Sequence, residues 1–277
     1  MTVALSPAQR RVPAQWEPQK CVWLAWPHCH ETWPGRFDPI PRFFQSLVQR
    51  IAESTPVRVL ASGEVARECQ KWLTGVAAAE LLDIPTNDCW IRDYGPTFVV
   101  EQAGPNMQPG PNMIGVDWKF NAWGGKYPPW DLDDAVGPQL CRAAEIRCVD
   151  GGLCLEGGAL EVDGYGRLLT TPDCLINENR NPGWTKRRIS LELHRQLGVT
   201  EIVWLDGGGL VGDDTDGHVD QLARFIDREN VVAAVCGRTA SENTDDQNSP
   251  PLEDNFRQLH LWGDATNPQV NIHRLPI

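Results

Sequence analysis

The densest group of side chains that could do acid–base chemistry lies at 214–220, where the sequence reads DTDGHVD. His218 and Asp220 are two positions apart, so on a strand both would project to the same face. A histidine beside a carboxylate can act as a general acid or base, since its unperturbed pKa is near neutral. A calcium loop fits less well, because its alternating oxygen ligands are not in register. A solvated acidic loop without catalytic function stays open as an alternative.

Two further carboxylates lie in surroundings that could place them in a pocket. Asp93 follows Arg92 and precedes a Gly-Pro turn in WIRDYGP. An ordinary surface turn with a local ion pair would look the same. Glu156 has apolar residues on both sides, so we expect it to be partly buried and therefore paired or functional. The alternative is a glutamate turned outward at the end of a strand.

An aromatic, glycine-rich and proline-rich segment at 120–130 reads FNAWGGKYPPW. Such a loop could form the wall of a pocket and stack on a planar cation. Plain packing beneath a long loop explains it equally well.

The three carboxylates recur at nearly constant spacing, with 63 residues from Asp93 to Glu156 and 64 from Glu156 to Asp220. Each lies in a short loop beside an apolar, strand-like run, and helix-like stretches separate them. In the stretch 184–197, for example, apolar residues fall at i, i+4 and i+8. We interpret this pattern as a repeated α/β module, although two matching spacings could be coincidence. Modules arranged around an axis would bring the three acidic loops to one pocket.

The remaining chain fits the same scheme. We expect strands at Val22–Trp26 and Val57–Leu60, with a helix at Phe43–Ala52 before the second. The Pro/Gly-rich segment Gln102–Asn112 and the segment Ser241–Pro251 are predicted to be loops. Neither marks a domain boundary, so we predict one domain over residues 1–277.

Charge and cysteine usage exclude several classes of protein. A net charge of −12 argues against nucleic-acid binding, which needs clustered Lys and Arg. It suits a cationic ligand, although solubility alone explains acidic composition in many proteins. The nine cysteines include no CxxC pair, which indicates reduced thiols rather than a zinc site or a disulfide framework. With no signal peptide and no apolar run of membrane-spanning length, we predict a soluble, cytoplasmic protein that does not bind membranes.

If Asp93, Glu156, His218 and Asp220 converge, the best-matched substrate is a guanidinium group. It is planar, permanently charged and presents a fork of five N–H donors, and carboxylates can bind it through paired, charge-assisted hydrogen bonds. Its central carbon is resonance-stabilised, so hydrolysis calls for a covalent nucleophile and a proton carrier.

Several sequence blocks resemble the agmatine deiminase and Porphyromonas-type peptidylarginine deiminase family in the same order: VPAQWEP, WLAWPH, WIRDYGPTFVV, FNAWGGKY, LEGGALEVDG with LLTTPDCLINENRNP, and DTDGHVDQLARF. The resemblance runs from about Val12 to Ile277. It implies the pentein fold, a five-bladed α/β propeller of repeated modules, here incomplete at the C-terminus.

The resemblance also implies roles for individual residues. Asp93 and Asp220 are expected to clamp the guanidinium, and His218 to act as the acid/base. Glu156 is expected to bind a substrate nitrogen and help set the charge of the histidine, with Trp90 and Trp123 as pocket walls. The implied reaction converts agmatine and water to N-carbamoylputrescine and ammonia, in putrescine and polyamine biosynthesis, without a metal or organic cofactor. Peptidyl-arginine is the alternative substrate.

The nucleophile that the resemblance implies is a cysteine in a glycine-rich block ending in His-Cys, close to the family's C-terminus. None of the nine cysteines lies in such a block, and Cys236 is better explained as a core thiol. We therefore expect a truncated family member that lacks its last module or so and does not turn over substrate. Unpaired strand edges would then favour aggregation or a homo-oligomer. A non-catalytic guanidinium-binding protein is the alternative from a different functional class.

Overall fold

The computed structural model describes residues 10–101, 112–237 and 247–277. Its first unit is a parallel sheet in the order β2-β3-β4, with helices in both connections. The elements are β2 (Val22–Ala25), η1 (His30–Thr32), α1 (Ile40–Ala52), β3 (Val57–Ala61), α2 (Gly63–Leu73) and β4 (Ala79–Asp83). Helix α1 begins three residues before the predicted Phe43, because Pro41 suits a first helical turn, where the amide hydrogen it lacks would have no helical partner.

Three further units follow, and each has its own three successive strands. The second contains α3 (Ile91–Tyr94), β5 (Thr97–Glu101), β6 (Asn112–Lys119), α4 (Ala122–Gly125), α5 (Asp131–Asp134), α6 (Val136–Ala143) and β7 (Arg147–Cys154). The third contains η2 (Gly157–Ala159), β8 (Glu161–Val162), β9 (Arg167–Thr170), α7 (Pro172–Leu175), α8 (Lys186–Leu197) and β10 (Glu201–Trp204). The fourth contains η3 (Val219–Gln221), β11 (Ala223–Asp227), β12 (Asn230–Val235), α9 (Ser249–Ala265) and β13 (Asn271–Pro276).

These three units share one topology. A short helical turn leads into an antiparallel pair of strands, and a helical connection then returns the chain to a third strand that is parallel to the second. The pairs β5/β6, β8/β9 and β11/β12 are antiparallel, whereas β6/β7, β9/β10 and β12/β13 are parallel. The repeated α/β module that the spacing predicts is therefore confirmed. Closure into five blades stays a prediction.

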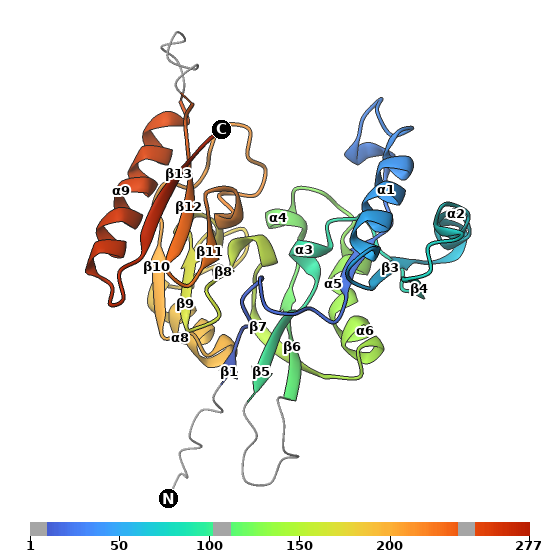
Figure 1. Cartoon of the computed structure of the whole chain (residues 1–277), viewed down its shortest axis with the longest axis horizontal. Helices are drawn as coiled ribbons and strands as arrows, with labels where there is room; N and C mark the ends of the chain where they lie inside the picture. The colour runs from blue at the N-terminus through green and yellow to red at the C-terminus, as the bar shows by residue number, and fades with distance from the viewer. Residues whose placement is uncertain (1–9, 102–111, 238–246) are drawn as a thin grey trace, which may run out of the picture.

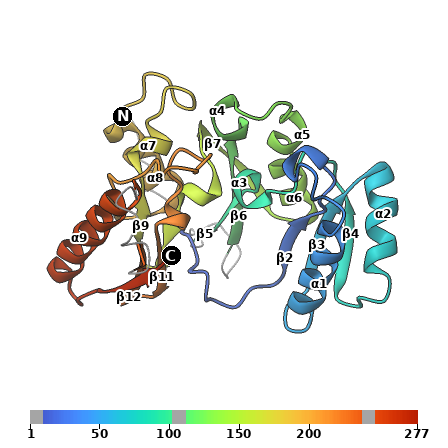
Figure 2. The ribbon, with the colours of Figure 1, turned by 90° about the horizontal axis from the view of Figure 1, so that it is seen from above.

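The modules lie side by side along the molecule. In Figure 1, the sheet β11–β13 with α9 lies at one end, the sheet β2–β4 with α1 and α2 lies at the other, and β5–β7 lie between them. The short strand β1 (Arg10–Arg11) pairs with β5. Figure 2 shows α9 on one outer side of the molecule and α2 on the opposite one. Among the described residues, no helix combines the length and apolar character needed to cross a membrane.

Each module buries an apolar helix face against its sheet. In α8, Ile189, Leu193 and Leu197 are all fully buried and pack against β-strand residues such as Leu153 and Leu168. The helix begins at Lys186 rather than at the predicted Trp184, because Thr185 caps it by accepting a hydrogen bond from the backbone of Arg188. The i, i+4, i+8 pattern thus predicts the buried face of this helix correctly.

Two local predictions are wrong. His218 and Asp220 do not share a strand, because Asp220 lies in the 3₁₀ turn η3 and His218 is the residue immediately before that turn. Their side chains are placed by this turn and not by strand alternation. The predicted loop at Ser241–Pro251 ends too late, because Ser249–Pro251 form the first turn of α9. Residues 241–246 of this loop lie outside the described residues. The same is true of residues 102–111 of the other predicted loop, Gln102–Asn112, whose last residue begins β6.

Candidate active site

The carboxylate of Asp93 is held in a fixed orientation at the junction of two modules. Asp93 lies in the single turn α3 and is 9% exposed. Its Oδ1 accepts a hydrogen bond from the backbone N–H of Gly158 at 2.9 Å, and its Oδ2 accepts one from Nε1 of Trp123 at 3.0 Å. A carboxylate oxygen can accept two hydrogen bonds, so each oxygen retains capacity for a ligand.

His218 lies between two carboxylates that come from different modules. Its Nδ1 is 3.7 Å from Oδ1 of Asp93, and its Nε2 is 3.6 Å from Oε2 of Glu156. The residue is only 2% exposed, and Nε2 has no hydrogen-bond partner within normal reach. This close approach requires glycine at 158, because a Cβ there would lie 2.3 Å from Nδ1 of His218 and 2.9 Å from Oδ1 of Asp93.

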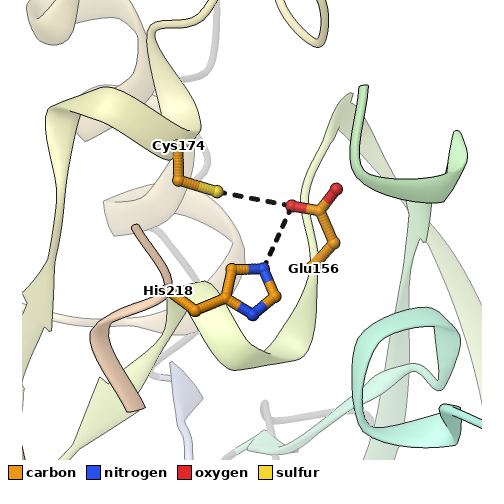
Figure 3. A group of neighbouring side chains, drawn as sticks. All are labelled: Glu156, Cys174 and His218. Atoms are coloured by element: carbon orange, nitrogen blue, oxygen red, sulfur yellow. Dashed lines mark hydrogen bonds and ion pairs between the residues drawn. The ribbon is translucent and has the colours of Figure 1, made fainter. Parts of the chain in front are cut away.

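Glu156 is fully buried and takes part in a polar network, shown in part in Figure 3. Nε of Arg180 donates to both of its oxygens, at 2.8 and 2.9 Å. The thiol of Cys174 donates to Oε2 at 3.4 Å, the same oxygen that the His218 ring approaches. The prediction that Glu156 is buried and paired is therefore confirmed, and the outward-facing alternative is wrong.

Burial disfavours the charged form of Glu156, His218 and Asp93, and the contacts among these residues decide whether each pKa rises or falls. For Glu156, burial favours the neutral acid, but His218 and Arg180 together hold its pKa below the usual value. For His218, burial favours the neutral ring, yet Glu156, Asp93 and Asp220 raise its pKa above the usual value. For Asp93, burial dominates and raises the pKa despite the contacts with His218, Gly158 and Trp123. The cluster thus favours an imidazolium between two carboxylates.

Asp220 and Trp90 occupy more exposed positions than Asp93, Glu156 and His218. The side chain of Asp220 is 19% exposed, its Oδ2 lies 4.0 Å from Nε of Arg92, and its charge contributes to the raised pKa of His218. Trp90 is 44% exposed and stacks on Trp33 with ring centroids 6.0 Å apart. Of the two predicted pocket walls, Trp123 therefore contacts a site carboxylate directly, whereas Trp90 presents an open aromatic face.

The loop that carries Trp123 adopts an uncommon backbone conformation. Trp123 and Gly124 have φ values of 55° and 86°, and the amide of Gly124 donates to the side chain of Asn121. Positive φ at a bulky residue is costly, so it persists only where surrounding contacts enforce it. Here the indole N–H bond to Asp93 is one such contact. The aromatic segment thus shapes the site and does more than pack beneath a loop.

Two further roles can be considered for Cys174, namely that of a metal ligand and that of the nucleophile. Glu156, Cys174 and His218 each have one potential ligand atom within 4.8 Å of the others. However, the Arg180 guanidinium already lies against both oxygens of Glu156, and this positive charge disfavours a cation there. The thiol is completely buried, and burial raises its pKa well above the usual value. Since the thiolate is the nucleophilic form, Cys174 is suited to hydrogen bonding and not to attack.

Sequence patterns assign no role to Arg180 or Cys174, although both lie in the block LLTTPDCLINENRNP. Their partners Glu156 and Asp216 are distant in the chain, so no local spacing connects them. An arginine within the polar run 177–181 is a weak signal, because most arginines are solvated. None of the nine cysteines, all of which are described, forms a disulfide.

Comparisons with known proteins agree with this architecture. A family model described as Porphyromonas-type peptidyl-arginine deiminase matches residues 11–277. An agmatine deiminase of Pseudomonas aeruginosa is 35% identical over 274 residues, covering 96% of this chain and 70% of that protein. The agmatine deiminase structure of Enterococcus faecalis has a TM-score of 0.82 at 34% identity, covering 97% of this chain and 71% of that one. A substrate-bound agmatine deiminase of C. jejuni has a TM-score of 0.83 at 28% identity, covering 100% and 77%.

The repeated modules, the buried carboxylate–histidine cluster and these matches define a hydrolase of guanidino C–N bonds. More particularly, the chain belongs to the Porphyromonas-type peptidyl-arginine deiminase family. The resemblance inferred from the sequence blocks is confirmed.

Proposed function

We propose that the site binds the guanidinium group of agmatine, and that the reaction it serves produces N-carbamoylputrescine and ammonia. The observation that carries this proposal is the orientation of Asp93, whose two oxygens are each fixed by one N–H donor and each retain room for another. A planar fork of N–H donors fits such a carboxylate. The matched agmatine deiminases, at 34–35% identity over nearly the whole chain, support the choice of agmatine over peptidyl-arginine.

In this proposal, Asp93 and Asp220 neutralise the guanidinium and orient its central carbon. His218 donates a proton to the departing ammonia and afterwards accepts one from the attacking water. Its position 3.7 Å from Asp93 and 3.6 Å from Glu156 supports a role in which it gains and loses a proton during the reaction. Trp123 keeps Asp93 in place, and Trp90 offers its exposed face to the substrate.

For Glu156, the contacts favour one of the two predicted roles. Both of its oxygens already accept from Nε of Arg180, and Oε2 also accepts from the thiol of Cys174. Oε2 therefore has no acceptor position left, and the complete burial of Glu156 keeps a substrate nitrogen from its Oε1. We therefore propose that Glu156 acts mainly on the charge of His218 and only secondarily on the substrate.

The proposed reaction needs a thiolate that forms a bond to the guanidinium carbon as the C–N bond breaks. Water then attacks that carbon, the C–S bond breaks and the thiolate is regenerated. The buried Cys174 is unsuited to this step, and burial also raises the pKa of Cys89 well above its usual value and that of Cys154 to about 12. We propose that none of the nine cysteines is the nucleophile, and that residues 1–277 bind agmatine without turning it over.

Two measurements on the 277-residue chain test this function. Calorimetry should show agmatine binding, and assays for ammonia and ureido product should show none above the buffer control. Release of ammonia at an enzymatic rate would overturn the assignment of the nucleophile but would support the substrate. If agmatine does not bind, the guanidinium site itself is refuted.

We further propose a single-domain, cytoplasmic protein that forms homo-oligomers. The continuous succession of similar modules supports one domain. Several apolar side chains of the last module are exposed and could be covered by a second copy: Ile226, Leu261, Leu275 and Ile277. Sedimentation velocity at two protein concentrations tests this, and a strictly monomeric chain would contradict it.

A further inference from the structure

We infer that Arg180 is a positioning residue, which fixes the buried carboxylate of Glu156 and the loop before His218 in one arrangement. The inference rests on the proposed function, in which His218 exchanges protons. Among the described residues, the Arg180 side chain makes no hydrogen bond to Asp93 or Asp220, the two carboxylates proposed to bind the guanidinium. It acts through Glu156 on the histidine.

The guanidinium of Arg180 joins two segments that are far apart in the sequence. Its side chain is completely buried, and Nε donates to both oxygens of Glu156. Nη1 donates to Oδ2 of Asp216 at 2.7 Å, and Nη2 donates to the carbonyl of Thr215 at 2.9 Å. One side chain therefore connects Glu156, at the start of η2, with the residues that lead directly to His218.

The loop before His218 is held by several independent contacts. Asp216 and Gly217 have φ values of 63° and 92°, a conformation that the chain would not favour without support. Lys126, from the aromatic segment, donates to Oδ1 of Asp216 at 2.7 Å. The hydroxyl of Thr171 donates to the carbonyl of Gly217 at 2.6 Å. Asp216 thus receives one cation on each oxygen, and Arg180 is the buried one of the two.

Stability alone is a poor explanation for this buried arginine. Removing charged groups from water is costly, and a well-packed apolar side chain often serves a fold as well as a buried ion pair. Arg180 and His218 are the two cations that pair with Glu156 among the described residues. The arginine therefore determines how much of the carboxylate's charge is available to the histidine.

The charges facing His218 give the expected direction of change. Asp93, Glu156 and Asp220 face it as anions, Cys174 donates to Glu156 as a neutral thiol, and Arg180 opposes the anions. Without Arg180, the imidazolium would be the remaining charged partner of a fully buried carboxylate, because Cys174 donates to it only as a neutral thiol. The pKa of His218 should then rise further, because the cation that repels the imidazolium and competes for Glu156 is gone.

The test is a side-chain NMR titration of His218 in the 277-residue chain without ligand, with its signal assigned by loss in H218N. We expect R180M to raise the pKa of His218 by about one pH unit. We expect R180K, which keeps the charge but not the fork of donors, to lie between R180M and the unmodified chain. Agmatine binding should weaken at least tenfold in R180M and be partly restored in R180K.

The control is N181S at the neighbouring position. Asn181 is buried and bonds to the backbone of Cys154 and Leu175, without a hydrogen bond to Glu156. The N181S variant should have a lower melting temperature and an unchanged pKa of His218. If R180M leaves that pKa unchanged, or if N181S moves it equally, the positioning role is overturned. If R180M does not fold, R180K alone decides by the same criterion.

The titration also separates this inference from the proposed function. It uses no ligand, so failure of agmatine to bind would refute the function and leave the histidine readout intact. Normal agmatine binding together with an unmoved histidine in R180M would refute only the role of Arg180.

Discussion

Nδ1 of His218 lies 3.7 Å from Oδ1 of Asp93, and the glycine at 158 is what allows the two residues to approach. Asp93 belongs to the second module, Gly158 to the third and His218 to the fourth. The amide of Gly158 also donates to the same Oδ1, so this one residue both makes room for the pair and holds one member of it. The site is therefore a product of three repeated turns meeting at one place.

Replacing Gly158 with alanine should damage the site more than the fold. Its Cβ would lie 2.3 Å from Nδ1 of His218, so the ring must move. We expect agmatine affinity to fall at least tenfold in calorimetry. The matched control is G183A, where φ is 72° but no atom lies within 4 Å of the added Cβ. That variant should lose about 1 kcal/mol of stability and bind normally. Equal binding losses in both would show that backbone strain, not the His218 contact, matters.

Neutralising Asp93 should weaken agmatine binding more than neutralising Asp220. In D93N, an amide nitrogen must face either the Gly158 amide or the Trp123 indole, and both are donors. The lost charge-assisted bonds correspond to about 10- to 100-fold in Kd. D220N should have a smaller effect, because Asp220 is more exposed and already pairs with Arg92. The control E68Q changes an exposed charge on α2. An affinity in D93N equal to that in E68Q would contradict the clamp.

Agmatine affinity should rise with pH through the pKa of His218, which lies above 6.5. Below that pKa, the imidazolium repels the cationic ligand, and above it the neutral ring does not. The change should approach tenfold per pH unit where His218 titrates. We expect H218N to abolish this dependence between pH 6 and 9 in calorimetry. H260N, at an exposed site on α9, should keep it. Persistence of the dependence in H218N would assign it to another group.

Asp133 provides a test of stability away from the proposed substrate position. It accepts hydrogen bonds from the amides of Asn87 and Asp88, just before α3, and burial raises its pKa from 3.8 to about 7. Because the folded state holds this proton more tightly than the unfolded state, the chain loses stability as pH rises from about 4 to 7. D133N should remove that loss and be more stable than the unmodified chain at pH 8, by about 2 kcal/mol.

Chemical denaturation at pH 4.5 and pH 8 measures this effect, with E68Q as the exposed control. The advantage of D133N should be largest at pH 8 and small at pH 4.5. An equal effect at both pH values would mean that the substitution alters packing and not a titration.

The residues that were predictable from the sequence are those with informative neighbours. Asp93, Glu156 and His218 are each set in a distinctive local segment, and the spacing of Asp93, Glu156 and Asp220 predicts the repeated module. Arg180 was not predictable, because its meaning comes from Glu156 and Asp216, which only folding brings near. The same holds for the 3₁₀ turn at Asp220: positive φ at Asp216 and Gly217 redirects the chain, and side-chain alternation cannot reveal that.

Proline residues are a misleading signal at the start of α9, whereas the end of α8 is easy to predict. In α9, Pro250 and Pro251 suggest a loop, yet they occupy the first turn of the helix, where a missing amide donor costs nothing. The helix of α8 was easier to predict, because Gly198 with φ 70° ends it and its apolar face is regular. Strong periodicity therefore predicted helices better than composition did.

Recognition of a guanidinium group is tested by comparing agmatine with cadaverine, a diamine without that group, by calorimetry at pH 8 on the 277-residue chain. We expect agmatine to bind at least 100-fold more tightly than cadaverine, and D93N to remove most of the difference. Equal affinity for the two ligands, or a difference that survives in D93N, would show that Asp93 does not recognise a guanidinium group.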